Sequence, residues 1–309
     1  MKNRWLFILV VILALALTSM VVAGIARIAL GVSSEGYERV GDGNVALIKI
    51  HGAIMTETSS SVWGGTSGVS SSTLSKQLED IQHDSRIKAV IFEINSPGGS
   101  GVATDEILQA IDRLNKTTVS YIRDIGASAG YWVAASTDQI FANRLSFVGS
   151  IGVIGSYLEF SGFLEDWNIT YQRFVGGEYK DFGSPFRQPS EAERAVFQQQ
   201  IDQVYDIFVQ DVATKRNLPL EHVQELATGM VYTGVKGEEL GLIDGIGGRI
   251  EAIAYLEQHL NETVTLIEFK RRVGIFDILA GAQATRSYYT GQGFADALLR
   301  GANEQRVYI

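Results

Sequence analysis

A serine stands between small residues in the run from Gly126 to Tyr131, which reads Gly-Ala-Ser-Ala-Gly-Tyr. A strand-like run, residues 118–123, precedes it, and a helix-like run, residues 131–137, follows it. At such a turn the Ser128 hydroxyl can be exposed, and the next backbone N–H groups point into the cleft at the positive end of the helix dipole. That is how a nucleophile and half of an oxyanion hole are built. The competing interpretation is that Ser128 is an ordinary helix-capping hydroxyl.

A serine hydroxyl also needs a base within hydrogen-bond reach. The run Gly126 to Gly130 matches G-x-S-x-G, and in a Ser-His-Asp scheme His222 or His259 would be that base. Both histidines lie in helix-like stretches rather than in a loop after a strand, which disfavours this scheme. The other scheme is a Ser-Lys dyad, in which burial lowers the pKa of a lysine. Lys180 is the best-placed lysine, because it lies in a loop after a strand-like run with aromatic neighbours.

The composition excludes several classes of protein. The chain has 309 residues, of which 46% are hydrophobic, and this is enough for a large core. Its formal net charge of −9, without a strongly basic block, argues against a nucleic-acid partner. The absence of cysteine rules out a cysteine protease, a thiolate metal site and disulfides. The four histidines form no HExxH pattern, and we expect neither a metal nor a cofactor.

The amino-terminal region has the pattern of a membrane segment. Residues 5–26 are uncharged and almost all apolar, and a helix of this length can span about 30 Å of hydrocarbon. Lys2 and Arg4 precede it, which predicts a cytoplasmic amino terminus, with the rest of the chain outside the cytoplasm. A cleaved signal peptide is the alternative, since 21–23 loosely resembles a cleavage site. The apolar run is long for such a peptide, which favours an uncleaved, single-pass anchor.

Beyond an anchor at 1–30 and a polar linker at 31–44, strand-like and helix-like runs alternate. The expected strands are 45–50, 88–94, 118–123, 139–142, 171–175 and 263–269. The expected helices are 73–82, 102–114, 131–137, 190–215, 220–227, 235–240 and 249–260. This alternation predicts an α/β domain at 45–269 with parallel strands and crossover helices. No role is assigned to the extension at 270–309.

Two glycine-rich turns fall at the carboxyl ends of expected strands, where such sheets bind ligands. They are Pro97-Gly98-Gly99 and the turn that contains Ser128, and we expect them to face each other across one crevice. A Ser/Gly/Thr-rich run at 56–72 is expected to be a mobile loop. Trp63 within it could fold over the crevice or be an incidental aromatic residue.

Several motifs occur in a characteristic order between about residues 45 and 265. They are Asn95–Gly99, Gly126–Tyr131, Gly149–Val153, Tyr179–Asp181 with Ser184–Phe186, Val231–Gly234, and Gly241–Asp244 with Gly247–Gly248. In this order and spacing the chain resembles the signal peptide peptidase SppA family, in its short, single-repeat type with one amino-terminal anchor. Val148, Met230 and the segment 235–237 depart from the usual family pattern, but none of them belongs to the suspected dyad.

The resemblance implies a fold and a set of site residues. The fold would be a ClpP/crotonase-like spiral of β-β-α units, preceded by one transmembrane helix. Ser128 would be the nucleophile and Lys180 the general base, with Ser150 hydrogen-bonded to the lysine. The oxyanion hole would be formed by backbone N–H groups of Gly99 or Gly98 and of Ala129.

The resemblance also implies partners. Remnant signal peptides and other membrane-associated peptides would be the substrates of this serine peptidase. The chain would form a homo-oligomer, in which Lys180 serves the Ser128 of a neighbouring protomer. A non-catalytic membrane-anchored scaffold of the same fold is the main rival. A crotonase-type acyl-CoA enzyme is a weaker one, because the expected export and the lack of basic residues for CoA phosphates argue against it.

Overall fold

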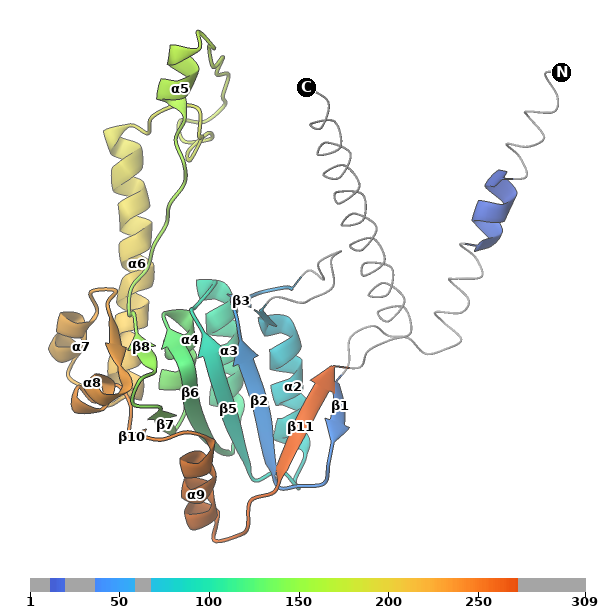
Figure 1. Cartoon of the computed structure of the whole chain (residues 1–309). Coiled ribbons are helices and arrows are strands. Elements are labelled where there is room, and N and C mark those ends of the chain that lie inside the picture. The colour runs from blue at the N-terminus through green and yellow to red at the C-terminus, as the bar shows by residue number, and fades with distance from the viewer. Residues whose placement is uncertain (1–11, 20–36, 59–67, 272–309) are drawn as a thin grey trace, which may run out of the picture. The chain divides into compact units, whose positions relative to one another are not determined.

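The computed structural model describes residues 12–19, 37–58 and 68–271 (Figure 1). The chain divides into two compact units, and the larger one comprises residues 41–59 and 67–268. We call this larger part the sheet unit. It contains every candidate site residue named above, so the fold is described for this unit by itself.

Strands and helices alternate through the sheet unit, as the sequence predicts. Its strands are β2 (Val45–His51), β3 (Ile54–Met55), β4 (Val69–Ser70), β5 (Ala89–Ser96), β6 (Thr117–Ala127), β7 (Gln139–Ala142), β8 (Phe147–Gly149), β9 (Val231–Thr233), β10 (Gly245–Ile246) and the start of β11 (Leu266–Arg271). Its helices are α2 (Ser71–His83), α3 (Gly101–Arg113), α4 (Ala129–Ala135), α5 (Ser161–Asp166), α6 (Glu191–Lys215), α7 (Leu220–Leu226), α8 (Gly234–Glu239) and α9 (Arg249–Leu260). The strand β1 (Tyr37–Val40) belongs to the other unit.

The main sheet is largely parallel. Its strands run in the order β11-β2-β5-β6-β7-β10, and each neighbouring pair is parallel. The strand β8 pairs in parallel with the end of β6 and antiparallel with β9. The short strands β3 and β4 form a separate pair. The expectation of an α/β fold with parallel strands is therefore confirmed.

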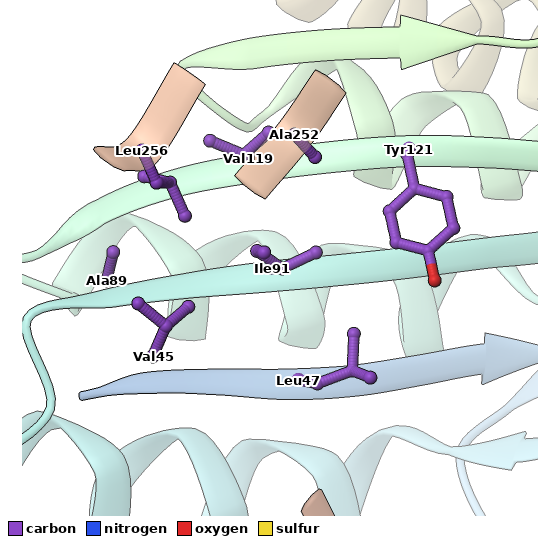
Figure 2. Close-up of a cluster of buried hydrophobic side chains, with 8 residues drawn as sticks. All are labelled: Val45, Leu47, Ala89, Ile91, Val119, Tyr121, Ala252 and Leu256. Carbon is purple, nitrogen blue, oxygen red and sulfur yellow. The ribbon is translucent and has the colours of Figure 1, made fainter. Parts of the chain in front are cut away.

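Helices cover both faces of this sheet (Figure 1). On one face, α9 packs on side chains that alternate along β2, β5 and β6, and Figure 2 shows this cluster. Its members are Val45, Leu47, Ala89, Ile91, Val119, Tyr121, Ala252 and Leu256. The helices α2, α3 and α4 lie on the opposite face (Figure 1). Parallel strands that are covered on both faces have continuous runs of apolar residues in their sequence, as residues 89–92 of β5 do.

The helix α6 begins where the sequence predicts it. Ser190 accepts from the Glu193 N–H, and the Glu193 carboxylate accepts from the Ser190 N–H, which completes the capping box. Near its other end, Phe208 stacks on Trp132 of α4 with 4.3 Å between ring centroids. The amino-terminal part of α6 rises away from the sheet, together with α5 and the segment around it (Figure 1).

The predicted strand at 171–175 is wrong, because this segment is irregular and exposed. A strand needs a partner for its backbone N–H and C=O groups, and this segment pairs with no described strand. The helix α5 and the short strands β3, β4, β9 and β10 were not predicted. Each is too short for a period of apolar residues to develop.

Several predictions fall wholly or partly outside the described residues. These are most of the expected membrane segment at 5–26, Trp63 with the middle of its loop, and most of the extension at 270–309. Residues 12–19 are helical and exposed. Within the parts of the chain that the structure describes, no helix combines the length and apolar character needed to cross a membrane.

Candidate active site

Ser128 lies at the turn between β6 and α4 with an unusual backbone conformation. Its φ is 51° and its ψ is −126°, and its side chain makes no capping hydrogen bond to the helix. A non-glycine residue in such a sparsely populated region costs on the order of 1–3 kcal/mol, and such strain clusters at functional sites. The residue occupies the N-cap position, but its half-buried hydroxyl does not act as a cap. The turn therefore presents Ser128 Oγ rather than using it to close the helix.

The glycines on either side of Ser128 are needed for close packing. A Cβ at Gly126 would lie 2.8 Å from the Ile122 Cδ1 atom, and a Cβ at Gly130 would lie 2.7 Å from the Ser96 carbonyl oxygen. Both distances are below real Cβ contacts, so a larger residue would push the turn away from β5 and β6. Close packing therefore explains why Gly126 and Gly130 are small residues.

The second glycine-rich turn faces Ser128, as the sequence predicts. Gly98 has a φ of 119°, and a Cβ on it would lie 2.8 Å from the Ser128 Cβ and 3.2 Å from its Oγ. The strand β3 holds this turn in place: the Ile54 N–H donates to the Gly98 carbonyl at 3.0 Å, and the Ser100 N–H donates to the Ile54 carbonyl at 2.8 Å. The two turns therefore form the opposite sides of one site.

Backbone N–H groups are available beside this hydroxyl. Ala129 is the first residue of α4, so its N–H has no acceptor within the helix. The Gly98 N–H donates to Ser96 Oγ at 3.2 Å, whereas the Gly99 N–H takes part in none of the hydrogen bonds among the described residues. Of the two glycines considered from the sequence, Gly99 is thus the better candidate for an oxyanion donor.

Ser150 lies next to Ser128 through the pairing of β8 with β6. The Ser128 N–H donates to the Gly149 carbonyl at 2.8 Å. Ser150 itself has a φ of 52°, and its hydroxyl donates to the Gly229 carbonyl at 3.1 Å. A hydroxyl that donates its only proton in this way keeps lone pairs with which to accept.

Lys180 is not brought to Ser128 within one chain. It is an exposed residue of an irregular loop that is attached to the first turn of α6, near Glu193. Ser128 directly precedes α4, and Trp132 of α4 contacts α6 at Phe208. The rise of 1.5 Å per residue puts these two attachment points about 22 Å apart along the axis of α6.

The histidines of the alternative scheme also lie elsewhere. His222 Nε2 is 3.2 Å from the Leu240 carbonyl oxygen, and the His259 ring stacks on Tyr255. None of the hydrogen bonds among the described residues joins either histidine to Ser128. The geometry gives the Ser-His-Asp scheme no support.

The sequence reasoning missed a set of polar residues in the carboxyl-terminal parts of β2, β5 and β6. Glu93 of β5 is buried; it accepts a hydrogen bond from the Tyr121 hydroxyl and lies 2.8 Å from His51 Nε2. Burial favours a raised pKa for Glu93, but the Tyr121 hydrogen bond and the charges of His51, Arg123 and Lys49 outweigh it, so the pKa lies below the usual range. The sequence did carry a signal for Glu93, because it is the one charged residue in the buried strand β5.

Asn95 also belongs to this set, and it bridges the ends of β5 and β6. Its Nδ2 donates to the Asp124 carboxylate at 2.9 Å, and its Oδ1 accepts from the Ile125 N–H at 3.2 Å. The register between the two strands shifts here, so that Ser96 pairs with Gly126. The Asn95 bridge therefore lies at this irregularity, where β5 and β6 approach the two turns.

Comparison with known proteins gives a consistent family. The model of peptidase family S49 matches residues 110–263. An Enterococcus faecium protein named "Putative signal peptide peptidase SppA" is 39% identical over 198 residues, which cover 63% of this chain and 58% of that protein. A Methanocaldococcus jannaschii protein whose name calls it a putative protease is 31% identical over 72% of this chain and 70% of that protein. The Arabidopsis thaliana protein named "Serine protease SPPA, chloroplastic" is 31% identical over 78% of this chain and 37% of its own length.

Proposed function

This chain belongs to peptidase family S49, and on that premise we propose that it is a membrane-anchored serine endopeptidase with a Ser-Lys dyad. The observation that carries the proposal is the strained backbone of Ser128, whose hydroxyl faces Gly98. The next residue, Ala129, begins α4, and its N–H has no acceptor within that helix. This combination supports a nucleophile with oxyanion donors already in place. The family name supports peptide-bond hydrolysis as the reaction.

In the proposed reaction the unprotonated Lys180 amine accepts the proton of the Ser128 hydroxyl while Oγ attacks the peptide carbonyl carbon. The Gly99 and Ala129 N–H groups donate to the oxygen on which negative charge develops. Lys180 then gives the proton to the leaving amine, and the acyl-enzyme ester is hydrolysed by a water that the same lysine deprotonates. Ser150 accepts a hydrogen bond from the lysine and orients it.

Lys180 is supplied in this proposal by a neighbouring protomer of a homo-oligomer. The separation of the lysine loop and the nucleophile at two places on α6 supports an intermolecular pair. The part of the sheet unit that carries the loop, residues 154–186, is rich in exposed apolar side chains, among them Phe174 at 91% and Trp167 at 68% exposure. Large exposed apolar surfaces of this kind mark interaction sites.

The finer fold and the location are part of the same proposal. A ClpP/crotonase-like spiral of β-β-α units fits the parallel sheet with helices on both faces. One amino-terminal transmembrane helix would hold the catalytic domain outside the cytoplasm and leave the amino terminus inside. Remnant signal peptides, which are apolar and lie in the membrane, are the proposed substrates, and the name of the relative from Enterococcus supports this class.

A serine-reactive phosphonate probe and a peptide cleavage assay test the dyad together. We expect Ser128→Ala to abolish labelling, and Ser128→Ala and Lys180→Ala each to lower cleavage by at least about 10³-fold, with the double variant no worse because the pair acts as a unit. Lys236→Ala is the matched control, since Lys236 is an exposed lysine paired with Glu239 on α8. A Lys180→Ala enzyme with near wild-type cleavage would refute the dyad. Wild type that neither labels nor cleaves would favour the scaffold.

A further inference from the structure

The loop that carries Lys180 has no helix or strand of its own. Its internal backbone bonds are those of short turns, such as the Lys180 N–H to the Gly177 carbonyl at 3.3 Å and the Phe182 N–H to the Tyr179 carbonyl at 3.1 Å. Such turns do not fix the direction in which a long side chain extends. A general base must be held within a fraction of an ångström of its target, so other contacts have to supply the rigidity.

Asp181, the residue after Lys180, is bound on both carboxylate oxygens by two guanidinium groups. Arg173 donates from Nε and Nη2 at 2.6 Å each, and Arg187 donates from Nε and Nη2 at 2.9 and 2.8 Å. The Asp181 side chain is only 13% exposed, although Lys180 beside it is exposed. Charge-assisted hydrogen bonds are about twice as strong as neutral ones, and bidentate geometry adds directional specificity.

Arg187 carries this attachment on to α6. Its Nη1 and Nη2 donate to the two Glu193 oxygens at 2.8 and 2.5 Å. The Glu193 side chain is 5% exposed, and the same carboxylate accepts from the Ser190 N–H in the capping box. The lysine loop is thus bonded, through one arginine, to the first turn of a helix of 25 residues.

An aromatic contact reinforces the same attachment. The Phe182 ring, two residues after Lys180, lies edge-on against Phe197 of α6 with 5.3 Å between centroids. At the other end of α6, Trp132 of α4 stacks on Phe208 and donates from Nε1 to Asp211 at 3.0 Å. One rigid helix, α6, therefore connects the lysine loop to α4, the helix that directly follows Ser128.

We infer that Asp181, Arg187 and Glu193 are positioning residues for Lys180, which bond its loop to the first turn of α6 and so fix where the amine is presented. This inference rests on the proposed role of Lys180 as the general base. Isolated ion pairs on a surface contribute little, but this one is a network with bidentate geometry and low exposure. The Arg187 and Arg173 hydrogen bonds hold the pKa of Asp181 well below its usual range, and the Arg187 hydrogen bond followed by the Ser190 N–H lowers that of Glu193 to about 2. Both carboxylates are therefore charged at neutral pH.

Amide hydrogen exchange on the full-length oligomer tests the structural half of the inference. In Asp181→Asn and Arg187→Met we expect residues 176–186 to exchange at least about tenfold faster than in wild type, because the loop opens locally. Exchange at the carboxyl-terminal half of α6 should not change. The control is Arg86→Met, which removes a bidentate arginine–aspartate pair with Asp84 far from the site. Unchanged exchange at 176–186 in both variants would overturn the inference.

Steady-state kinetics tests the functional half. We expect kcat of Asp181→Asn and Arg187→Met to fall by about 10- to 100-fold, the usual cost of displacing a reacting group by about 1 Å, while KM stays within about twofold. The Arg187→Lys variant should not restore kcat, because a lysine cannot make the two bidentate contacts. Sedimentation of each variant checks that the oligomer is intact. If Arg187→Met does not assemble into the oligomer, Asp181→Asn and Arg173→Met test the positioning role instead. Arg173→Met leaves the Arg187–Glu193 contact in place and should therefore lower kcat less than Asp181→Asn does.

The outcomes separate this inference from the proposed function. Loss of cleavage in Lys180→Ala together with a wild-type kcat in Asp181→Asn and Arg187→Met would refute the positioning role alone. Near wild-type cleavage in Lys180→Ala would refute the dyad, whatever the loop variants do. A rise in KM with an unchanged kcat would indicate lost substrate binding instead of a misplaced base, and would also refute the positioning role.

Discussion

Ser128 keeps a φ of 51° although it is not a glycine, and Gly98 opposite it has no room for a side chain. The two facts belong together, because the strained turn brings the hydroxyl so close to the neighbouring backbone that only a glycine fits. Strain of this kind persists only when the surroundings determine it completely. Here the determinants are the Gly149 carbonyl, which accepts from the Ser128 N–H, and the close packing at Gly130.

The Gly98→Ala variant should therefore lose activity more than stability. The added methyl group would lie 2.8 Å from the Ser128 Cβ atom, and the alanine backbone would have to keep a left-handed φ of 119°. We expect cleavage to fall by about 10²-fold or more, because both the hydroxyl and the oxyanion turn are displaced. Probe labelling of Ser128 and peptide cleavage measure the effect. Lys236→Ala, at an exposed lysine of α8 outside the site and outside 154–186, is again the control and should behave as wild type.

At this scale, sequence alone points to the proposed nucleophile but not to the proposed base. The small residues around Ser128 and the run Pro97-Gly98-Gly99 carry their packing requirement in the residue types themselves. Lys180 carries no comparable signal, because an exposed loop lysine beside acidic residues is also what an ordinary surface looks like. Its proposed role comes from the family resemblance, and the attachment of its loop to α6 comes from Arg187, which contacts both Asp181 and Glu193.

Among the elements, α6 contacts both the lysine loop and the helix that follows Ser128. Its first turn holds the lysine loop, and its last turns press Phe208 against Trp132 at the base of the site. We expect Phe208→Ala to lower the free energy of unfolding by about 3–5 kcal/mol, the usual cost of removing a fully buried aromatic ring. Urea unfolding measures this, and Ile250→Ala, at an exposed position of α9, is the control. A loss below about 1 kcal/mol would mean that α6 does not depend on this contact.

The strand β5 supplies a prediction about pH. Because the folded pKa of Glu93 lies below its unfolded value, its ionisation contributes stability above the unfolded pKa, and this is lost as pH falls through the folded pKa. The stability difference between wild type and Glu93→Gln should therefore be larger at pH 7 than at pH 3. Urea unfolding at both pH values measures it. A difference that grows toward acid pH would contradict the assignment of Glu93 as a charged, paired group.

The elements that sequence predicts well are those with long apolar patterns. The helices α2, α3, α6 and α9 and the strands β2, β5 and β6 begin and end within a few residues of their expected places, apart from the carboxyl end of β6. The strand expected at 171–175 is wrong because apolar alternation says nothing about whether a partner strand is present. The bridge made by Asn95 could not be foreseen, since it depends on a register shift between two strands.

At the scale of the whole molecule, the sheet unit exposes apolar side chains over 154–186 that a solitary chain would not be expected to leave uncovered. The same segment carries Lys180, whose loop is attached at Glu193, about 22 Å along α6 from the Phe208 contact with α4. Both features follow if this segment lies against another copy of the chain. Substitution of Trp167 and Phe174 by serine should then produce smaller particles in sedimentation and lower cleavage in parallel, whereas unchanged particle size would argue against this surface.

Complementation between two inactive variants tests the central claim most directly. Ser128→Ala and Lys180→Ala chains with different tags are co-expressed, mixed oligomers are isolated through both tags, and peptide cleavage is measured. If Lys180 serves the Ser128 of a neighbour, mixed oligomers should regain about a quarter of wild-type activity at random assembly, because a working pair needs one chain of each kind in the right order. Mixed oligomers no more active than either variant alone would contradict the account.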